Sequence, residues 1–242
     1  MYTPLEQFKI DSYLSLSSNN WSLDLNKSTI YLLLSLVLLL FINKIFIRKE
    51  IIINNKFSYI IYNFIRLVHK QFEEVLTING NNYVSLIISL FIFIVINNII
   101  GLVPYSFTTT SQIIITLFMS TSIIIGVTFT GIIKHNISFI KLFIPQGIPV
   151  LLVPIIFVIE IISYLSRIIS LSVRLTANMV SGHILLAIIS TFGYNIGIIG
   201  SILFFIPVLM IFYILEFGVA IIQGFVFSVL TATYIKDSVL LH

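Results

Sequence analysis

Three charged side chains, Glu160, Arg167 and Arg174, follow one another at intervals of seven residues in an otherwise apolar stretch. Seven residues turn an α-helix through about 700°, so each charge lies only about 20° from the one before it. A helix over this stretch therefore carries all three charges on one stripe. A charge at the centre of a bilayer costs about 2.5–3.5 kcal/mol on insertion scales, so such residues mark either an ion pair or a path for charge.

Small polar side chains continue this stripe within about 80° of Glu160 on a helical wheel. They are Ser163, Ser170, Asn178 and Ser181. In the next apolar segment, Glu216 and Gln223 repeat the interval of seven residues. His183 lies about 140° from Glu160 on an ideal wheel, so it either serves another surface or marks a bend. Small polar residues also join membrane helices by hydrogen bonds, and both interpretations of the serines and the asparagine stay open.

The number of acids decides which arginine lacks a partner. The last two apolar segments hold two acids, Glu160 and Glu216, against two arginines and one histidine. Glu160 lies two turns nearer to Arg167 than to Arg174, so a purely structural ion pair with Arg167 is one interpretation. Glu216 has His183 as an available companion. Arg174 is therefore expected to need a carboxylate from another chain.

The composition places these charges in a membrane. Of the 242 residues, 58% are hydrophobic and 9% are charged, whereas a soluble domain has roughly 25% charged residues. The chain has no cysteine, which excludes disulfides and thiolate metal sites. Neither a zinc-binding spacing nor a nucleophile elbow, phosphate loop or dinucleotide fingerprint is present, so no metal or cofactor is expected. The net charge of +4 collects between apolar segments, which indicates topology and not nucleic-acid binding.

The apolar pattern predicts an all-α polytopic membrane protein with one membrane domain, residues 1–242. The expected segments are an N-terminal segment (1–29), a first span (30–47), an amphipathic surface helix (57–78), two further spans (83–103 and 112–133), and two long antiparallel helices (146–192 and 196–235). The apolar stretch within the first long helix would be about 65 Å long, twice the bilayer thickness, so it must tilt strongly or bend. A turn is expected at Gly193-Tyr194-Asn195, and His69 and His135 are expected at the solvated surface.

The distribution of charge also gives an orientation. Basic residues follow the first span, the third span and the last segment, whereas the other two connections between spans carry none. With five crossings and the N-terminus outside, every basic connection lies on the inner side. Alanine is rare while isoleucine, asparagine, phenylalanine and tyrosine abound. AT-rich codons give this usage, which suggests an organelle genome.

These residues resemble one family closely. The run SLSVRLTANMVSGH (170–183) is similar to the arginine-bearing helix of subunit a of F-type rotary ATP synthases, whose mitochondrial form reads Arg-Leu-x-x-Asn-x-x-x-Gly-His. Further similar runs lie at 4–8 (PLEQF), 159–167 (IEIISYLSR), 215–217 (LEF), 222–226 (IQGFV) and 230–237 (LTATYIKD). Ser172, Ser181 and Ser238 stand where the family usually has glycine, alanine and alanine. They keep the side chains small.

The resemblance implies a stator subunit of the membrane Fo sector that forms two offset proton half-channels against a rotating c ring. Proton translocation through them would drive ring rotation and ATP synthesis. By resemblance, Arg174 is the essential charge facing the c-ring carboxylate. His183 and Glu216 belong to the outer half-channel, and Glu160 and Asp237 to the matrix-side one.

Supporting roles are implied for Gln223, Asn178, Arg167 and Ser170, with Gln223 opposite the essential arginine. The implied partners are the c ring, peripheral-stalk subunit b, other small Fo subunits, protons and lipid; nucleic acid, cofactors and metals are not among them. The chain would not be an enzyme on its own. It would span the mitochondrial inner membrane with its N-terminus in the intermembrane space and its C-terminus toward the matrix.

Two other functions fit an intramembrane charge relay. One is a stand-alone proton-coupled secondary transporter, although the matched Gly/Pro-broken helices and inverted repeats of many transporters are not visible in two halves of this chain. The other is a structural subunit of a respiratory complex, in which the charges only join helices.

Overall fold

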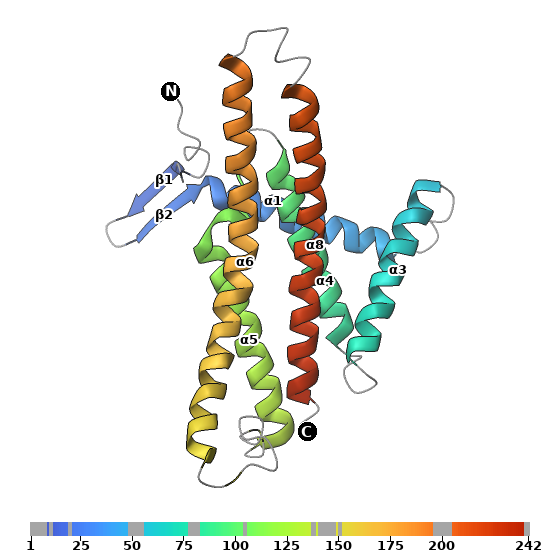
Figure 1. Ribbon diagram of the computed structural model, residues 1–242, viewed down its shortest axis with the longest axis vertical. Coiled ribbons are helices and arrows are strands. Elements are labelled where there is room, and N and C mark those ends of the chain that lie inside the picture. The colour runs from blue at the N-terminus through green and yellow to red at the C-terminus, as the bar shows by residue number, and fades with distance from the viewer. Residues whose placement is uncertain are drawn as a thin grey trace. The chain divides into compact units, whose positions relative to one another are not determined.

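The computed structural model describes residues 9, 12–18, 21–47, 56–76, 83–103, 106–136, 139, 149, 152–195 and 205–239. Its elements are β1 (Ser12–Ser18), β2 (Trp21–Asn26), α1 (Lys27–Ile47), α3 (Lys56–Leu76), α4 (Val84–Leu102), η3 (Thr109–Ser111), α5 (Ile113–His135), α6 (Val153–Asn195) and α8 (Ile206–Val239), drawn in Figure 1. The long membrane helices confirm the all-α polytopic class. The only strands in the described residues form one short ribbon near the N-terminus.

The chain divides into two compact units, and α4, α6 and α8 each contribute to both. Unit 1 is Met1–Ile47, Ile92–Ile113 and Leu175–Phe225. Unit 2 is Arg48–Phe91, Ile114–Arg174 and Val226–His242. Within unit 1, and separately within unit 2, the segment of α6 lies beside the antiparallel segment of α8 (Figure 1).

Unit 1 begins with an antiparallel ribbon that the sequence analysis did not predict. Its register pairs Ser12 with Asn26 and Ser18 with Trp21, with an irregularity between Ser12 and Leu14. Both strands alternate polar and apolar residues, which is the period of a β-strand. The ribbon leads directly into α1.

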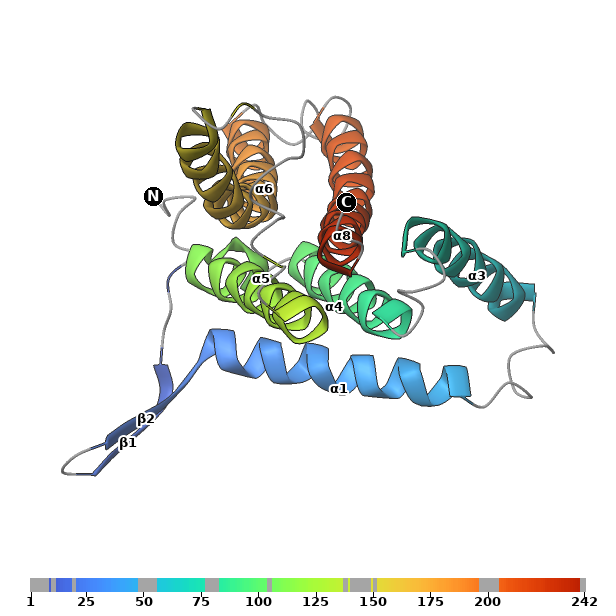
Figure 2. The same cartoon turned by 90° about the horizontal axis from the view of Figure 1, so that it is seen from below.

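Helix α1 covers the predicted first span, 30–47. Its 21 residues reach about 32 Å at 1.5 Å each, which is enough to cross a bilayer. Leu33, Val37, Leu40 and Phe41 are more than half exposed, as expected of side chains that face lipid. Within unit 1, α1 runs crosswise to the segments of α6 and α8 (Figure 2).

Four described helices are long and apolar enough to span a membrane, namely α4, α5, α6 and α8. Helices α4 and α5 correspond to the predicted spans 83–103 and 112–133. In α1 the apolar helical stretch, Lys27–Ile42, is shorter than a full span. The predicted total of five crossings includes α1, so it stays a prediction. Helix α5 ends where Asn136 takes a left-handed conformation, with φ 49°, as is common just past a helix end.

Helix α3 in unit 2 is amphipathic, as predicted for 57–78. Val68, Phe72 and Leu76 are buried, while Arg66, Lys70, Glu73 and Glu74 are exposed. The Phe72 ring meets Phe91 of α4 edge-on, with centroids 6.4 Å apart. His69 is exposed and pairs only with Glu73 of its own helix, at 3.3 Å.

The two long helices are present, with shifted ends. Helix α6 has 43 residues, about 65 Å at 1.5 Å each, and runs on through Asn195. The turn expected at 193–195 is therefore wrong, because those residues continue the helix. Residues 146–148, 150–151 and 196–204 of the predicted segments lie outside the described residues. Pro154 and Pro207 occupy the second positions of α6 and α8, where a missing backbone N–H removes no helical hydrogen bond.

Candidate functional site

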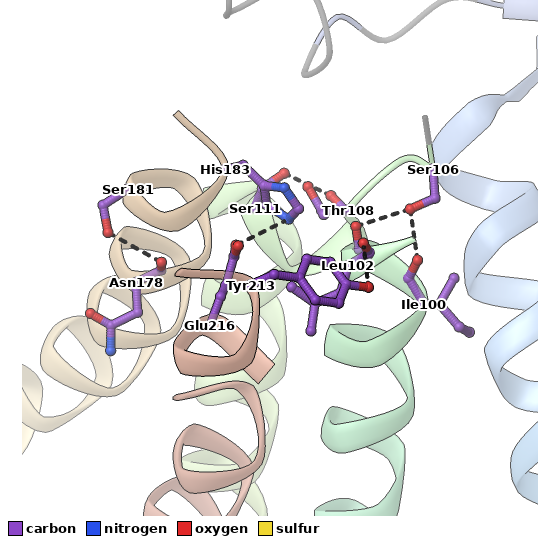
Figure 3. A network of polar contacts seen from close by, with 11 residues as sticks. Ile100, Leu102, Ser106, Thr108, Ser111, Asn178, Ser181, His183, Tyr213 and Glu216 are labelled. Atoms are coloured by element: carbon purple, nitrogen blue, oxygen red, sulfur yellow. Dashed lines mark hydrogen bonds and ion pairs between the residues drawn. The ribbon is translucent and has the colours of Figure 1, made fainter. Parts of the chain in front are cut away.

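His183 and Glu216 form an ion-pair contact in unit 1 (Figure 3). The distance from His183 Nε2 to Glu216 Oε1 is 3.8 Å, and the two side chains are 13% and 5% exposed. The contact explains why His183 lies off the stripe that begins at Glu160: it faces α8. Helix α6 continues without a break at this point, and the contact with Glu216 supports the alternative that His183 serves another surface.

Gly182 makes this close approach of the carboxylate to α6 feasible. A Cβ atom at position 182 would lie 2.5 Å from Oε1 and 2.9 Å from Cδ of Glu216. Any side chain other than hydrogen would therefore occupy the place of the carboxylate. The sequence analysis did not single out this glycine, although it stands next to His183 in the family motif.

A cavity of about 370 Å³ lies beside the pair, between the unit 1 segments of α6 and α8. Its polar lining comes from Asn178, Ser181, Glu216 and Gln223, and its remaining walls are mostly apolar. The Ser181 hydroxyl donates to the Asn178 carbonyl at 3.1 Å (Figure 3). The polar stripe of α6 and the Glu216–Gln223 stripe of α8 thus meet in one cavity.

Helix α4 holds α8 on both sides of Glu216. Asn98, which is fully buried, donates from Nδ2 to the carbonyl of Ala220 at 3.1 Å, one turn after Glu216. The Tyr213 hydroxyl, nearly one turn before Glu216, donates to the carbonyl of Leu102 at 3.2 Å (Figure 3). These bonds fix the position of α8 along α4 and so place the carboxylate.

The uncharged connection between α4 and α5 brings buried and half-buried hydroxyl groups to the same end of unit 1. The Ser106 hydroxyl bonds to the carbonyl of Ile100 at 2.7 Å, and the Ser111 hydroxyl to that of Thr108 at 2.7 Å (Figure 3). Thr109, also buried, donates to Asn97 Oδ1 at 2.9 Å. The sequence analysis noted only that this connection is uncharged, and its hydroxyl content was the missed signal.

In unit 2, Arg167 contacts one carboxylate and two tyrosine rings. Its Nη2 atom lies 3.4 Å from Glu160 Oε1. Its guanidinium also lies 5.4 Å from the centroid of the Tyr234 ring and 5.7 Å from that of Tyr164. The ion pair considered from the sequence is present. The two tyrosines were not predicted as partners, although both stand in motifs that resemble the family.

Arg174 has a different environment. Its side chain is exposed, and Nη2 donates to the Ser170 hydroxyl at 3.4 Å. No described carboxylate of unit 2 lies within 4.0 Å of its guanidinium. Asp237, exposed near the end of α8, also has no ion-pair partner among the described residues of that unit.

His135 differs from the solvated residue expected from the sequence. Its Nε2 atom lies 3.0 Å from the carbonyl oxygen of Val239, at the end of α8 in unit 2. A polar side chain at this place satisfies a carbonyl that has no partner within its own helix. No pattern in the sequence indicates this contact between residues 104 positions apart.

Residues 29–236 match the family of the ATP synthase A chain. The chain belongs to this family. Subunit a of ATP synthase from Trichophyton rubrum is 40% identical over 99% of this chain and 97% of its own length. The Emericella nidulans subunit a is 42% identical over 99% of this chain and 97% of its own length. That of Neurospora crassa is 40% identical over 99% of this chain and 95% of its own length.

Family membership gives the chain its general function. It is the proton-translocating stator subunit of the Fo sector, one subunit of the ATP synthase enzyme complex. The matches give no support to a stand-alone transporter or to a structural subunit of a respiratory complex. The fungal relatives and the apolar helices support a multi-pass protein of the mitochondrial inner membrane.

Proposed function

We propose that Arg174 is the charge that this chain presents to the carboxylates of a rotating c ring, between two offset proton half-channels. The observation that carries the proposal is the pairing of the other charges. Glu160 lies against Arg167, and Glu216 against His183, while Arg174 is exposed and no carboxylate among the described residues of its unit lies within 4.0 Å of it. A cation in a membrane needs an opposite charge, so its partner comes from another chain.

The outer half-channel contains His183 and Glu216. Their contact at 3.8 Å joins an imidazole ring, whose two nitrogens can accept and donate a proton, to a carboxylate, which suits a proton relay. The cavity beside them offers room for water, and its polar groups supply hydrogen-bond partners. Asn178 and Gln223 are supporting residues of this half-channel, because both line the cavity.

The matrix-side half-channel contains Glu160, with Asp237 at its mouth. Arg167 has a supporting role, in which it holds the Glu160 carboxylate and joins α6 to Tyr234 of α8. Ser170 supports Arg174, because its hydroxyl oxygen accepts a hydrogen bond from the Arg174 guanidinium.

The charge of Arg174 couples proton movement to rotation. A guanidinium close to a ring carboxylate stabilises its ionised form, so the carboxylate releases its proton there. An ionised carboxylate is costly in lipid, so it must take up a proton before it leaves the stator. The fixed positive charge also opposes direct passage of a proton. A proton therefore crosses only by travelling with the ring.

The chain is oriented with its N-terminus in the intermembrane space and its C-terminus toward the matrix. Lys134, Lys236 and the basic residues after the first span then all lie on the matrix side. If α1 crosses the bilayer, its crosswise course relative to the α6 and α8 segments of unit 1 tilts those segments strongly (Figure 2). Subunit b and other Fo subunits are further partners. The chain performs no reaction on its own, and an organelle genome encodes it.

Replacement of Arg174 by alanine tests the central assignment. We expect Arg174→Ala to abolish ATP synthesis by the assembled complex, because ring carboxylates lose the charge that deprotonates them. The measurement is ATP synthesis in inner-membrane vesicles, per assembled complex on native gels. Synthesis at the normal rate in Arg174→Ala would refute the assignment.

Cysteine crosslinking tests the location of Arg174. The chain has no cysteine of its own, so Ser170→Cys and Asn178→Cys each introduce a single thiol next to Arg174. We expect both to crosslink to ring cysteines placed beside the ring carboxylate. Ser122→Cys on the exposed face of α5 is the control and should not crosslink to them. Crosslinks from residues 170 and 178 to fixed subunits alone would contradict the proposal.

A further inference from the structure

A hydrogen bond between two buried hydroxyl groups joins α5 to α6 in unit 2. The Oγ1 atom of Thr116 and the Oγ atom of Ser172 are 3.0 Å apart, and either can be the donor. Both residues have no exposed surface. Ser172 stands two residues before Arg174.

This bond lies where α6 first becomes buried. From Val153 to Ser170 no described residue of α6 is buried, and Leu171 and Ser172 are the first, 3% and 0% exposed. On α5, the buried residues follow one another at intervals of three or four and so form one face. They are Thr116, Ser120, Ile124, Val127 and Gly131. Thr116 thus belongs to the packed face of α5 and Ser172 to the first packed turn of α6.

The position of Ser172 determines the direction of Arg174. Two residues turn an α-helix through about 200°, so a helix that points Ser172 at α5 points Arg174 to nearly the opposite side. The exposed side chain of Arg174 agrees with this geometry. Apolar contacts such as those of Leu171 have no preferred direction, whereas a hydrogen bond tolerates only a narrow range of distance and angle. The hydroxyl pair therefore restricts rotation of α6 about its own axis.

We propose that Thr116 and Ser172 are positioning residues for proton translocation, which fix the rotation of α6 so that Arg174 faces away from α5 and toward the ring. This inference rests on the proposed role of Arg174.

The test uses the intact ATP synthase in inner-membrane vesicles with Thr116→Val, Ser172→Ala and the double variant. A hydrogen bond between membrane helices contributes the equivalent of about threefold, and at most about twentyfold, in an equilibrium constant. We expect ATP synthesis per assembled complex to fall by about threefold to twentyfold in each single variant. Passive proton leak through Fo, measured after removal of the catalytic head, should rise because Arg174 no longer holds its place.

Three comparisons separate positioning from simple support of the fold. Thr116→Ser keeps the hydroxyl group and should restore normal turnover and a tight membrane. The double variant should be no worse than either single variant, because both remove the same bond. Thr128→Val on α5 and Ser166→Ala on α6 remove hydroxyl groups that bond only within their own helices, and both should be normal.

Fewer assembled complexes with normal turnover and no leak would overturn the inference, since the pair would then serve stability alone. Equal damage from Thr116→Ser and Thr116→Val would also overturn it. In both cases, loss of synthesis in Arg174→Ala would leave the proposed function standing. Normal synthesis in Arg174→Ala would remove the proposed function and this inference with it.

Discussion

The contact between Gly182 and Glu216 allows a prediction in which neither His183 nor Glu216 is replaced. Gly182→Ala adds one methyl group to α6, and its carbon would lie 2.5 Å from Oε1, 2.9 Å from Cδ and 3.1 Å from Cγ of Glu216. Ordinary contact begins near 3.4 Å. The carboxylate must therefore move by almost 1 Å, and the cavity that it lines leaves it room to do so. The movement separates it from His183.

The size of the effect follows from the cost of overpacking. An extra methyl group in a packed site costs about 1–3 kcal/mol, and 1.4 kcal/mol corresponds to a tenfold change. We therefore expect Gly182→Ala to lower ATP synthesis per assembled complex by about tenfold. Gly126→Ala on α5, where a Cβ would meet nothing within 4 Å, is the matched control and should be normal.

A second substitution shows whether the carboxylate itself is displaced. Glu216→Asp shortens the side chain by one methylene and leaves room for the new methyl group. We expect Gly182→Ala with Glu216→Asp to be more active than the product of the two single effects. The assay is ATP synthesis driven by an imposed proton gradient in vesicles, normalised to the amount of complex. Normal activity in Gly182→Ala, or strictly multiplicative effects in the double variant, would refute the reasoning.

Three further predictions concern the contacts of α8. Glu216→Leu should slow proton-driven synthesis severely and Glu216→Asp less, since only the second keeps a carboxylate; equal effects would assign the residue a structural role. Asn98→Leu removes the buried hydrogen bond to the Ala220 carbonyl and should lower the stability of the extracted complex by about 1 kcal/mol. An unchanged melting curve would show that this bond does not stabilise the contact between α4 and α8. Tyr234→Leu should destabilise the complex by about 0.5–1 kcal/mol through loss of the ring contact with Arg167, whereas Tyr234→Phe keeps that contact, and similar losses in both would contradict it.

The helices were predictable because long apolar runs and one amphipathic period determine them. The amphipathic pattern at 57–78 corresponds to α3, and the two longest apolar stretches to α6 and α8. The ends of the helices were less predictable. Gly193 favours a turn by propensity, yet the helix continues through it, since glycine weakens a helix by only about 1 kcal/mol.

The site was predictable only as far as charge determines it. Counting acids and bases suggested the Glu160–Arg167 pair as one interpretation and His183 as an available companion of Glu216, because an unpaired charge in a membrane is costly, and both contacts are present. The fixed neighbours of these pairs came from tertiary contacts between uncharged groups. Asn98 reaches a backbone carbonyl 122 residues away, and a main-chain acceptor leaves no trace in the sequence.

The charged and ionisable residues of α6 and α8 differ in whether they have an ionisable partner within this chain. Glu160, Arg167, His183 and Glu216 each contact an oppositely charged or ionisable side chain, and tyrosine rings or backbone groups hold the helices that carry them. Among the described residues of its unit, Arg174 contacts the neutral hydroxyl of Ser170 and no carboxylate. A carboxylate fixed in this chain would satisfy the guanidinium permanently, and ring carboxylates could then not exchange on it. On the role proposed for Arg174, the absence of such a carboxylate from the described part of unit 2 would leave the charge available to one ring subunit after another.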